Sequence, residues 1–400
     1  MNILQVNSVC GISSTGRIAE SIGHLLTEKG HESFIAYGRG VYCGRESSKR
    51  IGSDVQVAVH AFMSRLTDRQ GLYSNRATKE LISLINTRKP DIIHLHNIHG
   101  YYLNYYILFS YLQKANIPIV WTLHDCWPFT GHCAFFDYIG CEKWKTQCCN
   151  CPQKKEYPSS YVLDYSHENY LLKKESFSSV KNMVIVTPSE WMAGLVRESF
   201  LSDKKTAVIN NGIDTTIFSR KEKNDDDVLK KYNIDSLSSK NIILGVANTW
   251  SKRKGLLDFI ELANRLPDEY KIVLVGIPKD QIDNLHANII GLPRTDSADD
   301  LAALYRTASV FANPTYDDNY PTTNIEALAC GTPVVTYDIG GSAEPIPNKK
   351  GVVAKGDVDG LLAAITGELY SVDVQEGQFE ASQKYKQYIS LYESILHECK

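Results

Sequence analysis

Carboxylates, hydroxyls and an expected helix start lie together in residues 315–335, which read TYDDNYPTTNIEALACGTPVV. The surrounding pattern predicts a strand over 309–312 and a helix over 322–328. Free backbone N–H groups at a helix start attract anions, and a diphosphate suits such a site. Asp318 in the loop can face a sugar. Glu326, about one turn into the helix, can accept hydrogen bonds from two neighbouring ribose hydroxyls.

This combination predicts a nucleotide site. The residues between the two carboxylates are expected to complete its surface: Asn319, Tyr320, Pro321, Thr322 and Thr323. The alternative is an acidic residue that only serves the helix dipole, with Glu326 on a solvated face. That alternative would be enough to explain a single carboxylate. It does not explain the whole segment as well as a nucleotide site does.

A second pattern suited to phosphate follows the strand expected over 242–246. Arg253 and Lys254 come just before a helix expected over 255–265. Positive charge at a helix start opposes the helix dipole, which favours a function over ordinary solvated side chains. Lys254, helped by Arg253, can neutralise a leaving diphosphate as the bond to it breaks.

Two candidate residues in the first half follow expected strands. His124 comes directly after the strand expected over 117–123, and ligands of parallel sheets bind beyond the carboxyl ends of strands. Gly16 lies between the first strand and the helix expected over 17–28. The full G-x-G-x-x-G pattern is missing here, which argues against a nicotinamide-dependent oxidoreductase. The alternative for this segment is a helix capped by Ser or Thr.

Asn211 and Asp214 belong to the sequence Asn-Asn-Gly-Ile-Asp after a strand expected over 207–209. Asn-Gly is a turn signal, so a purely structural turn is one interpretation. A position at the edge of a ligand cleft is the other.

Six of the ten cysteines fall between residues 126 and 151. The spacing of Cys133, Cys141, Cys148 and Cys151 is compatible with a structural zinc site of four thiolates. Such a site would stabilise a long loop that has no helix or strand of its own. Reduced free cysteines and a redox-sensitive disulfide are the alternatives.

These residues must be positioned by alternating strands and helices. Short apolar runs without period-2 alternation predict parallel strands that are covered on both faces. In the first half they fall at 3–6, 33–37, 92–95, 117–123, 184–187 and 207–209, and in the second at 242–246, 271–275, 309–312 and 333–335. Helices are expected at 17–28, 79–87, 255–265, 297–307, 322–328 and 380–398. The pattern predicts two doubly wound α/β domains.

The segment 315–335 resembles the signature of glycosyltransferase family 4. Ala329-Cys330-Gly331-Thr332-Pro333-Val334-Val335 follows two acidic residues separated by seven positions, as in that family. The first acidic residue is Asp318, where the family usually has Glu, and Thr249 stands where it usually has Arg. The loop from Trp127 to Cys133 is similar to that of members that form polysaccharides.

The resemblance implies the GT-B fold, which has two facing Rossmann-like domains. We expect an acceptor-side domain over 1–204, joined by a terminal helix over 378–400 that crosses back to it. A donor-binding domain is expected over 205–377. The resemblance also implies retention of the anomeric configuration and domain closure that brings His124 and Gly16 to the transferred sugar. No cofactor is expected for catalysis, since cations and a helix end stabilise the leaving diphosphate.

The composition agrees with a globular protein and gives no electrostatic case for nucleic-acid binding. The chain has 400 residues, 43% hydrophobic and 22% charged, with a formal net charge of −3. It has no apolar run long enough for a membrane span, and its first residues do not resemble a signal peptide. We therefore expect a cytoplasmic protein with mostly reduced cysteines.

Two features of the sequence suggest a second location for the protein. They are the segment 100–114, which reads GYYLNYYILFSYLQK, and a basic stretch that includes Arg65 and Arg69. Aromatic and basic residues suit peripheral binding to the inner face of the cytoplasmic membrane. An ordinary helix that faces the core is the alternative.

The expected function is transfer of a hexosyl unit in cell-surface polysaccharide synthesis. The donor would be a UDP- or GDP-sugar, and the acceptor a saccharide or a polyprenyl-linked saccharide. The alternatives are a nucleotide-sugar epimerase or hydrolase of the same fold and a non-catalytic sugar-binding subunit. The departures at Asp318 and Thr249 would support the non-catalytic subunit.

Overall fold

The chain folds into two compact units. The computed structural model describes residues 1–41, 47–220, 225–234, 241–283, 285–375 and 377–398. The first unit comprises Met1–Asn211 and the segment from Ser382 onward, and the second comprises Gly212–Ala381. The structure thus divides the chain at 211/212 and 381/382, where the sequence led us to expect 204/205 and 377/378.

The first unit is built on a seven-stranded parallel sheet. Its strands run in the order β3 (Ser48–Arg50), β2 (Glu32–Tyr37), β1 (Asn2–Asn7), β4 (Ile92–Leu95), β5 (Ile119–Thr122), β6 (Met183–Thr187) and β7 (Lys205–Val208). Its helices are α1 (Ser13–Glu28), α2 (Asp54–Thr67), α3 (Asn75–Arg88), α4 (Tyr105–Ala115), α5 (Ser166–Ser178), α6 (Glu190–Glu198) and α13 (Ala381–Glu398). Strand order reverses beside β1, because β2 lies on one side of it and β4 on the other.

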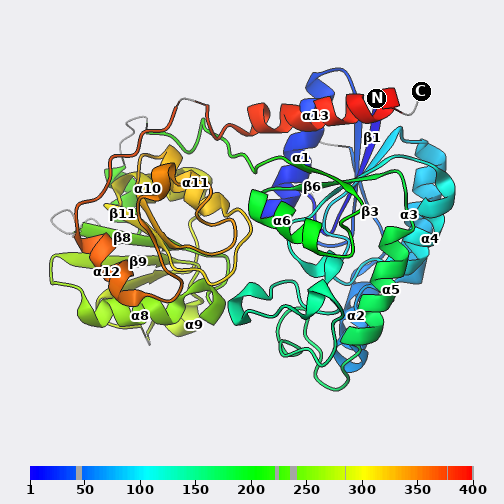
Figure 1. The fold of residues 1–400 in the computed structure, drawn as a ribbon. Coiled ribbons are helices and arrows are strands. Elements are labelled where there is room, and N and C mark those ends of the chain that lie inside the picture. Colours follow the sequence, from blue (N-terminus) through cyan, green and yellow to red (C-terminus); the bar gives the residue numbers. More distant parts are fainter. Residues whose placement is uncertain (42–46, 221–224, 235–240, 284, 376, 399–400) are drawn as a thin grey trace. The chain divides into compact units, whose positions relative to one another are not determined.

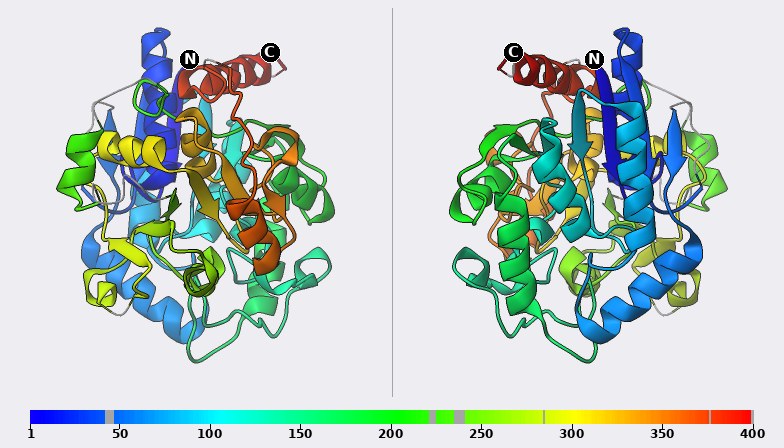
Figure 2. Two further views of the ribbon diagram at one scale, coloured as in Figure 1. Left: turned by 90° about the vertical axis from the view of Figure 1, so that its left-hand side faces the viewer. Right: turned by 90° about the vertical axis from the view of Figure 1, so that its right-hand side faces the viewer.

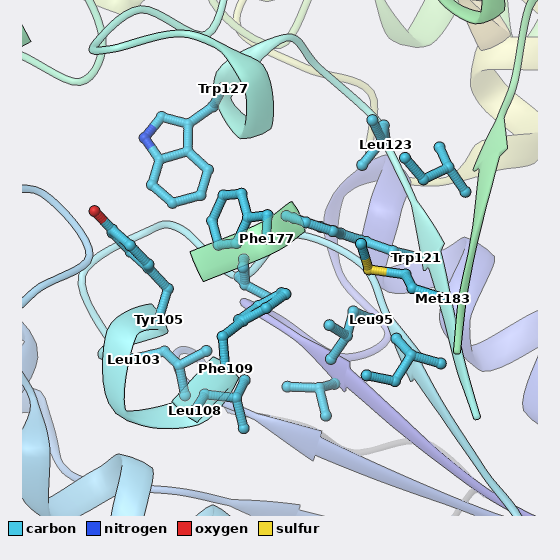
Figure 3. Close-up of a cluster of buried hydrophobic side chains, with 14 of the residues drawn as sticks. Leu95, Leu103, Tyr105, Leu108, Phe109, Trp121, Leu123, Trp127, Phe177 and Met183 are labelled. Carbon is cyan, nitrogen blue, oxygen red and sulfur yellow. The ribbon is translucent and has the colours of Figure 1, made fainter. Parts of the chain in front are cut away.

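The larger core of this unit lies between the sheet and helices α3, α4 and α5 (Figure 1). Figure 3 shows its aromatic part, where Phe109 of α4 and Phe177 of α5 lie against Trp121 of β5. The ring centroids of Phe109 and Phe177 are 4.5 Å apart, within the range of favourable aromatic pairs. Tyr105 and Trp127 extend this cluster toward the loop that follows β5.

The second unit has a six-stranded parallel sheet. The order is β10 (Ile289–Leu292), β9 (Tyr270–Val275), β8 (Asn241–Val246), β11 (Val310–Asn313), β12 (Val334–Tyr337) and β13 (Val352–Val353). The helices are α7 (Asp226–Lys231), α8 (Leu256–Arg265), α9 (Lys279–Ile282), α10 (Ala298–Thr307), α11 (Thr322–Ala329) and α12 (Val358–Thr366). Helices α10 and α11 cover one face of the sheet and α8 and α12 the other (Figure 1). Both sheets agree with the predicted pair of doubly wound α/β domains.

The terminal helix α13 packs on the first unit, as predicted. In Figure 2 this helix, drawn in red, runs past the start of the first strand. The hydroxyl of Tyr392 lies 2.7 Å from Nδ1 of His94 on β4, and that of Tyr388 lies 3.0 Å from the Thr122 hydroxyl on β5. All four side chains are buried, so these hydrogen bonds tie the C-terminal segment to the sheet interior.

The aromatic run over 100–114 belongs to the core. Tyr101, Tyr102 and Tyr105 are buried, and among the run's tyrosines only Tyr106 is more than a third exposed, at 47%. Two interpretations of this run were given, a membrane-binding surface and a helix that faces the core. The second is therefore the correct one. The burial follows from the position of α4 between the sheet and α5.

Candidate functional site

The second unit places two predicted phosphate-binding segments side by side. Strand β8 pairs with β11 in parallel, and order reverses at β8, which pairs with β9 on its other side. The loops after β8 and β11 therefore leave the sheet at the same edge, at the point where ligands of doubly wound sheets bind. Lys254 and Asp318 lie on these two loops.

An ion pair joins the two loops. Nζ of Lys254 lies 2.5 Å from Oδ2 of Asp318, and their side chains are 24% and 18% exposed. The sequence had suggested separate tasks, phosphate for Lys254 and sugar for Asp318. The structure brings the two charges together, so a ligand that binds the Lys254 ammonium group must compete with Asp318 for it.

Arg253 binds the neighbouring loop through both its side chain and its backbone. Its guanidinium donates a hydrogen bond to the backbone carbonyl of Asp317 at 2.6 Å, and its own carbonyl accepts one from the N–H of Tyr316 at 2.8 Å. The side chain therefore helps to hold the loop after β11 in place, and its contact with a diphosphate stays a prediction. Gly255 is required here, because its φ is +76° and an added Cβ would lie 2.2 Å from the carbonyl oxygen of Pro314.

Glu326 points into the protein and not to a solvated face. It is 8% exposed, and Oε2 accepts a hydrogen bond from the hydroxyl of Tyr305 on α10 at 3.0 Å. Burial raises the pKa of the Tyr305 phenol well above its usual value, with the nearby Glu326 charge acting in the same direction. Tyr305 thus remains a hydrogen-bond donor that fixes the carboxylate. The dipole-only explanation of Glu326 does not account for this burial.

The start of α11 offers backbone N–H groups to an anion. Pro321 is the N-cap residue, no described side chain caps the helix, and its first turn holds no acidic residue. Thr322 and Thr323 are partly exposed, while Asn319 and Tyr320 are buried before them. A helix start of this kind has both the donors and the dipole to attract a phosphate group.

Two buried asparagines fix where this helix begins. The Asn313 side-chain amide donates to Oδ1 of Asn324 at 2.8 Å, and the Asn324 amide donates to the carbonyl of Ser342 at 2.8 Å. Gly340, in the same loop as Ser342, has a φ of +57°, and an added Cβ would lie 2.1 Å from the carbonyl oxygen of Asp318. Sequence reasoning missed this loop. The pair Gly340-Gly341 directly after a strand was the available signal.

In the first unit, His124 ends a line of buried polar groups. Its Nε2 lies 3.1 Å from Nδ1 of His96, whose Nε2 lies 3.1 Å from Oε1 of Gln5 on β1. Burial lowers the pKa of His124 to about 4, so its imidazole is neutral at pH 7. A neutral imidazole at the carboxyl end of a strand can accept or donate a hydrogen bond to a sugar hydroxyl.

His99 and Asp125 form a second pair at this edge, which the sequence did not single out. His99 Nε2 lies 2.8 Å from Oδ2 of Asp125, and its Nδ1 lies 3.0 Å from the hydroxyl of Tyr157. Burial alone would raise the pKa of Asp125, but His99 and the backbone N–H of Trp127 together lower it. The pair connects the strand ends with the loop that carries Tyr157.

Gly16 lies inside a helix and not in the loop before it. Helix α1 begins at Ser13, four residues earlier than predicted, and no Ser or Thr side chain caps it. A Cβ at Gly16 would lie 3.2 Å from the backbone nitrogen of Gly11, so the glycine allows the loop after β1 to pack closely on α1. The N-cap alternative for this segment is wrong.

Asn211 and Asp214 lie on either side of the division between the units. Asn211 is buried, whereas Asp214 is exposed and accepts hydrogen bonds from the backbone N–H and the hydroxyl of Thr216 at 2.9 and 2.6 Å. Asp214 therefore stabilises its own turn, which agrees with the structural interpretation of this segment.

The four predicted zinc ligands gather at one place. Cys133, Cys141, Cys148 and Cys151 line a single small cavity in the loop after β5. All are free thiols, and within the described ranges no three His, Cys, Asp or Glu side chains already surround a point where a metal ion would sit.

Comparisons with known proteins agree with this architecture. A family model described as Glycosyltransferase Family 4 matches residues 15–217, and one described as Glycosyl transferases group 1 matches residues 240–369. The chain is 31% identical over 231 residues to a putative colanic acid biosynthesis glycosyl transferase, WcaC, of Escherichia coli K12, covering 54% of this chain and 55% of that protein. It is 30% identical over 187 residues to N,N'-diacetylbacillosaminyl-diphospho-undecaprenol alpha-1,3-N-acetylgalactosaminyltransferase of Campylobacter jejuni, covering 44% and 47%. The chain thus matches only about half the length of these relatives.

Solved structures show the same fold at low sequence identity. A sucrose-phosphate synthase of Thermosynechococcus elongatus aligns over 100% of this chain and 97% of its own, with a TM-score of 0.67 and 15% identity. Anabaena Alr3699/HepE in complex with UDP aligns over 98% and 100%, with a TM-score of 0.64 and 14% identity. These likenesses confirm the GT-B fold predicted from the sequence.

Proposed function

Because the chain belongs to glycosyltransferase family 4, we propose that it transfers a hexosyl unit from a UDP- or GDP-sugar to a saccharide acceptor, with retention of the anomeric configuration. The observation that carries this proposal is the buried carboxylate of Glu326, fixed by Tyr305 behind the uncapped start of α11. A rigid carboxylate beside a helix start suits a ribose and a diphosphate at the same time.

Each group in the second unit then has a task in the reaction. Glu326 accepts hydrogen bonds from the ribose hydroxyls, and the N–H groups of Thr322 and Thr323 bind the diphosphate. Lys254 neutralises the charge that develops on the diphosphate as the glycosidic bond breaks. Asp318 orients the donor sugar and, before the donor binds, offsets the charge of Lys254.

The first unit supplies the saccharide side. His124 is neutral at pH 7, so it can bond to a sugar hydroxyl without bringing a charge to the reacting centre. Gly16 keeps the loop after β1 close to α1, and in this proposal that loop borders the acceptor.

We further propose that the acceptor is lipid-linked and that α2 binds the membrane carrying it. Val55, Val59, Phe62 and Leu66 form an exposed apolar stripe along this helix, and Phe62 is 60% exposed. The stripe continues onto residues 161–163, whose backbone pairs with the carbonyls of Arg65 and Leu66. Exposed Arg65 and Arg69 add positive charge that favours an anionic bilayer. No helix in the described ranges could span a membrane.

One assay tests the transfer. Purified protein is incubated with UDP-, GDP- and ADP-sugars, with and without a lipid-linked saccharide extract, and nucleotide release is measured. Release that rises only with the acceptor supports transfer, whereas equal release without it supports the epimerase or hydrolase alternative. No binding of any nucleotide would exclude the proposal. The anomeric configuration of the product, read by NMR, tests retention.

Vesicle flotation tests the membrane contact separately. Wild-type protein should float with vesicles that contain phosphatidylglycerol, and a Phe62→Ser, Leu66→Ser variant should not. A matched variant, Leu257→Ser with Ile260→Ser, removes two exposed apolar side chains of α8 in the second unit. It should float like wild type, and equal loss in both variants would contradict a role for α2.

A further inference from the structure

The long segment between β5 and α5 contains a small cavity lined by thiols. Cys133, Cys141, Cys148 and Cys151 line this cavity, which measures about 20 Å³. A space of that size holds one water-sized guest. The thiols of Cys133 and Cys151 are hydrogen-bonded to each other across it. The buried aromatic side chains of Phe136 and Trp144 form part of its wall.

His132 provides a second, independent sign of a ligand. It lies on the cavity wall and is 3% exposed. Its Nδ1 contacts Oδ1 of Asp68, a carboxylate that is also buried. Its Nε2 is buried and has no hydrogen-bond partner among the described residues. A buried polar atom without a partner destabilises the fold, so its retention on this wall indicates an interaction that the cavity's guest would supply.

A buried lysine lies beside the segment that carries these thiols. Lys173 of α5 is 1% exposed, and its Nζ donates to the carbonyls of Trp127 and Thr130 at 2.7 and 3.0 Å. The ammonium also lies 3.5 Å from the centre of the Trp127 ring. Burial lowers the pKa of Lys173 to about 7, while Cys148 and Cys133, when ionised, act to raise it. A buried positive charge is offset best by a negative group in the same enclosure.

We propose that Cys133, Cys141, Cys148 and Cys151 bind one structural zinc ion as four thiolates. Binding replaces four thiol protons with Zn²⁺, which leaves a net charge of −2 on the centre. Lys173 offsets part of that charge, and His132, whose ring is oriented by Asp68, donates a hydrogen bond from Nε2–H to one of the thiolates. The Cys133–Cys151 hydrogen bond is lost as side-chain rotation brings the four sulfurs around the metal.

The site would stabilise residues that reach the rest of the first unit. The same segment carries Tyr157, which bonds to His99, and Tyr161 and Leu163, which pair with the end of α2. Between β5 and α5 the structure has only three short 3₁₀ turns among the described elements. Such a segment gains order from a metal, because the binding free energy of the ion contributes to its folding.

Metal content tests the proposal without any activity assay. The full chain is purified under reducing conditions without chelator, and its zinc is measured by mass spectrometry. We expect about one zinc per chain in wild type, and at least a fivefold lower content in Cys148→Ser and Cys151→Ser. Cys149→Ser is the matched control, since Cys149 borders the same cavity but is exposed and is not one of the four proposed ligands. It should retain the metal.

Cobalt substitution keeps the test valid if a serine variant fails to fold. Wild-type protein stripped of zinc and loaded with Co²⁺ should show the intense near-ultraviolet charge-transfer bands and the visible bands of a tetrahedral thiolate site. Wild-type protein without zinc, even after incubation with it, would overturn the proposal. So would equal loss of zinc in Cys149→Ser, or a cobalt spectrum without thiolate bands.

Discussion

Nζ of Lys254 lies 2.5 Å from the carboxylate of Asp318, although the two residues are 64 positions apart in the sequence. The contact exists because β8 and β11 are neighbours and release their loops at one edge of the sheet. An incoming diphosphate competes with Asp318 for the same ammonium group. We therefore expect the two residues to affect diphosphate binding in opposite directions.

Replacing Lys254 with alanine should lower kcat/KM for the proposed transfer. Removing one preorganised contact to a developing charge costs roughly 10²–10³-fold in rate. Steady-state kinetics with coupled detection of the released nucleotide measures the effect. Lys252→Ala is the control, because Lys252 belongs to the same short turn and is exposed. Equal impairment of both variants would show that only the general charge of the turn matters.

Replacing Asp318 with asparagine should separate binding from turnover. The variant removes the competitor for Lys254, so UDP or GDP should bind at least as tightly as to wild type. Turnover should fall about 10-fold or more, since contacts to the donor sugar that strengthen in the transition state are lost. Calorimetry gives the affinity and kinetics the turnover. Asp318→Glu, which keeps the charge, should retain most activity. A loss of diphosphate affinity in Asp318→Asn would contradict the competition.

Tyr305→Phe tests whether the position of Glu326 matters. The variant removes the hydroxyl that donates to Oε2 and leaves the ring in the core. A hydrogen bond to a charged group contributes about 1.5–3 kcal/mol, so donor KM should rise about 10-fold while kcat changes little. Glu326→Gln should weaken donor binding further than Tyr305→Phe does. Glu368→Gln, at an exposed position, is the control. An unchanged donor KM in both Glu326→Gln and Tyr305→Phe would exclude the ribose assignment.

Gly340→Ala should disturb Asp318 from a distance. The new methyl group would lie 2.1 Å from the carbonyl oxygen of Asp318, at a residue whose φ is +57°. Gly30→Ala is a matched control, because Gly30 has a φ of +77° with no atom within 4 Å of the added Cβ. Both variants bear the backbone strain of about 1 kcal/mol, and only Gly340→Ala adds the steric clash. Thermal melting should show a larger drop in Tm for Gly340→Ala than for Gly30→Ala. Turnover of the donor should fall only in Gly340→Ala.

The sequence predicted most of the strands and the acidic segment, but it missed β3, β10 and β13 and the side-chain contacts between elements. Apolar runs such as 92–95 coincide with strands because burial on both faces requires continuous hydrophobicity. The helix start at Thr322 was predicted for a similarly local reason. The contact of Tyr305 with Glu326 depends on the packing of α10 against α11, which no local pattern reveals. The aromatic run 100–114 posed the same difficulty, since its composition suits a core and a surface equally.

Acid should destabilise the first unit through His94 and His124. Burial lowers the pKa of His94 to about 3 and that of His124 to about 4, whereas an unfolded histidine titrates near 6.5. The unfolded chain therefore binds protons that the folded chain excludes. The free energy of unfolding is therefore highest above about pH 6.5. It falls as the pH is lowered toward 4, by up to about 1.4 kcal/mol per histidine for each pH unit.

The variant His94→Gln should flatten this dependence. Urea unfolding at pH 7.5, 6.5 and 5.5 can be followed by tryptophan fluorescence, because four of the five tryptophans lie in the first unit. His94→Gln should be less stable than wild type at pH 7.5, since its bonds to Thr122 and Tyr392 are lost. The difference in the free energy of unfolding between wild type and this variant should narrow by about 1 kcal/mol at pH 5.5. His24→Gln changes an exposed histidine beside Glu28 and should keep the wild-type slope. If His94→Gln also keeps that slope, His94 does not contribute to the pH dependence.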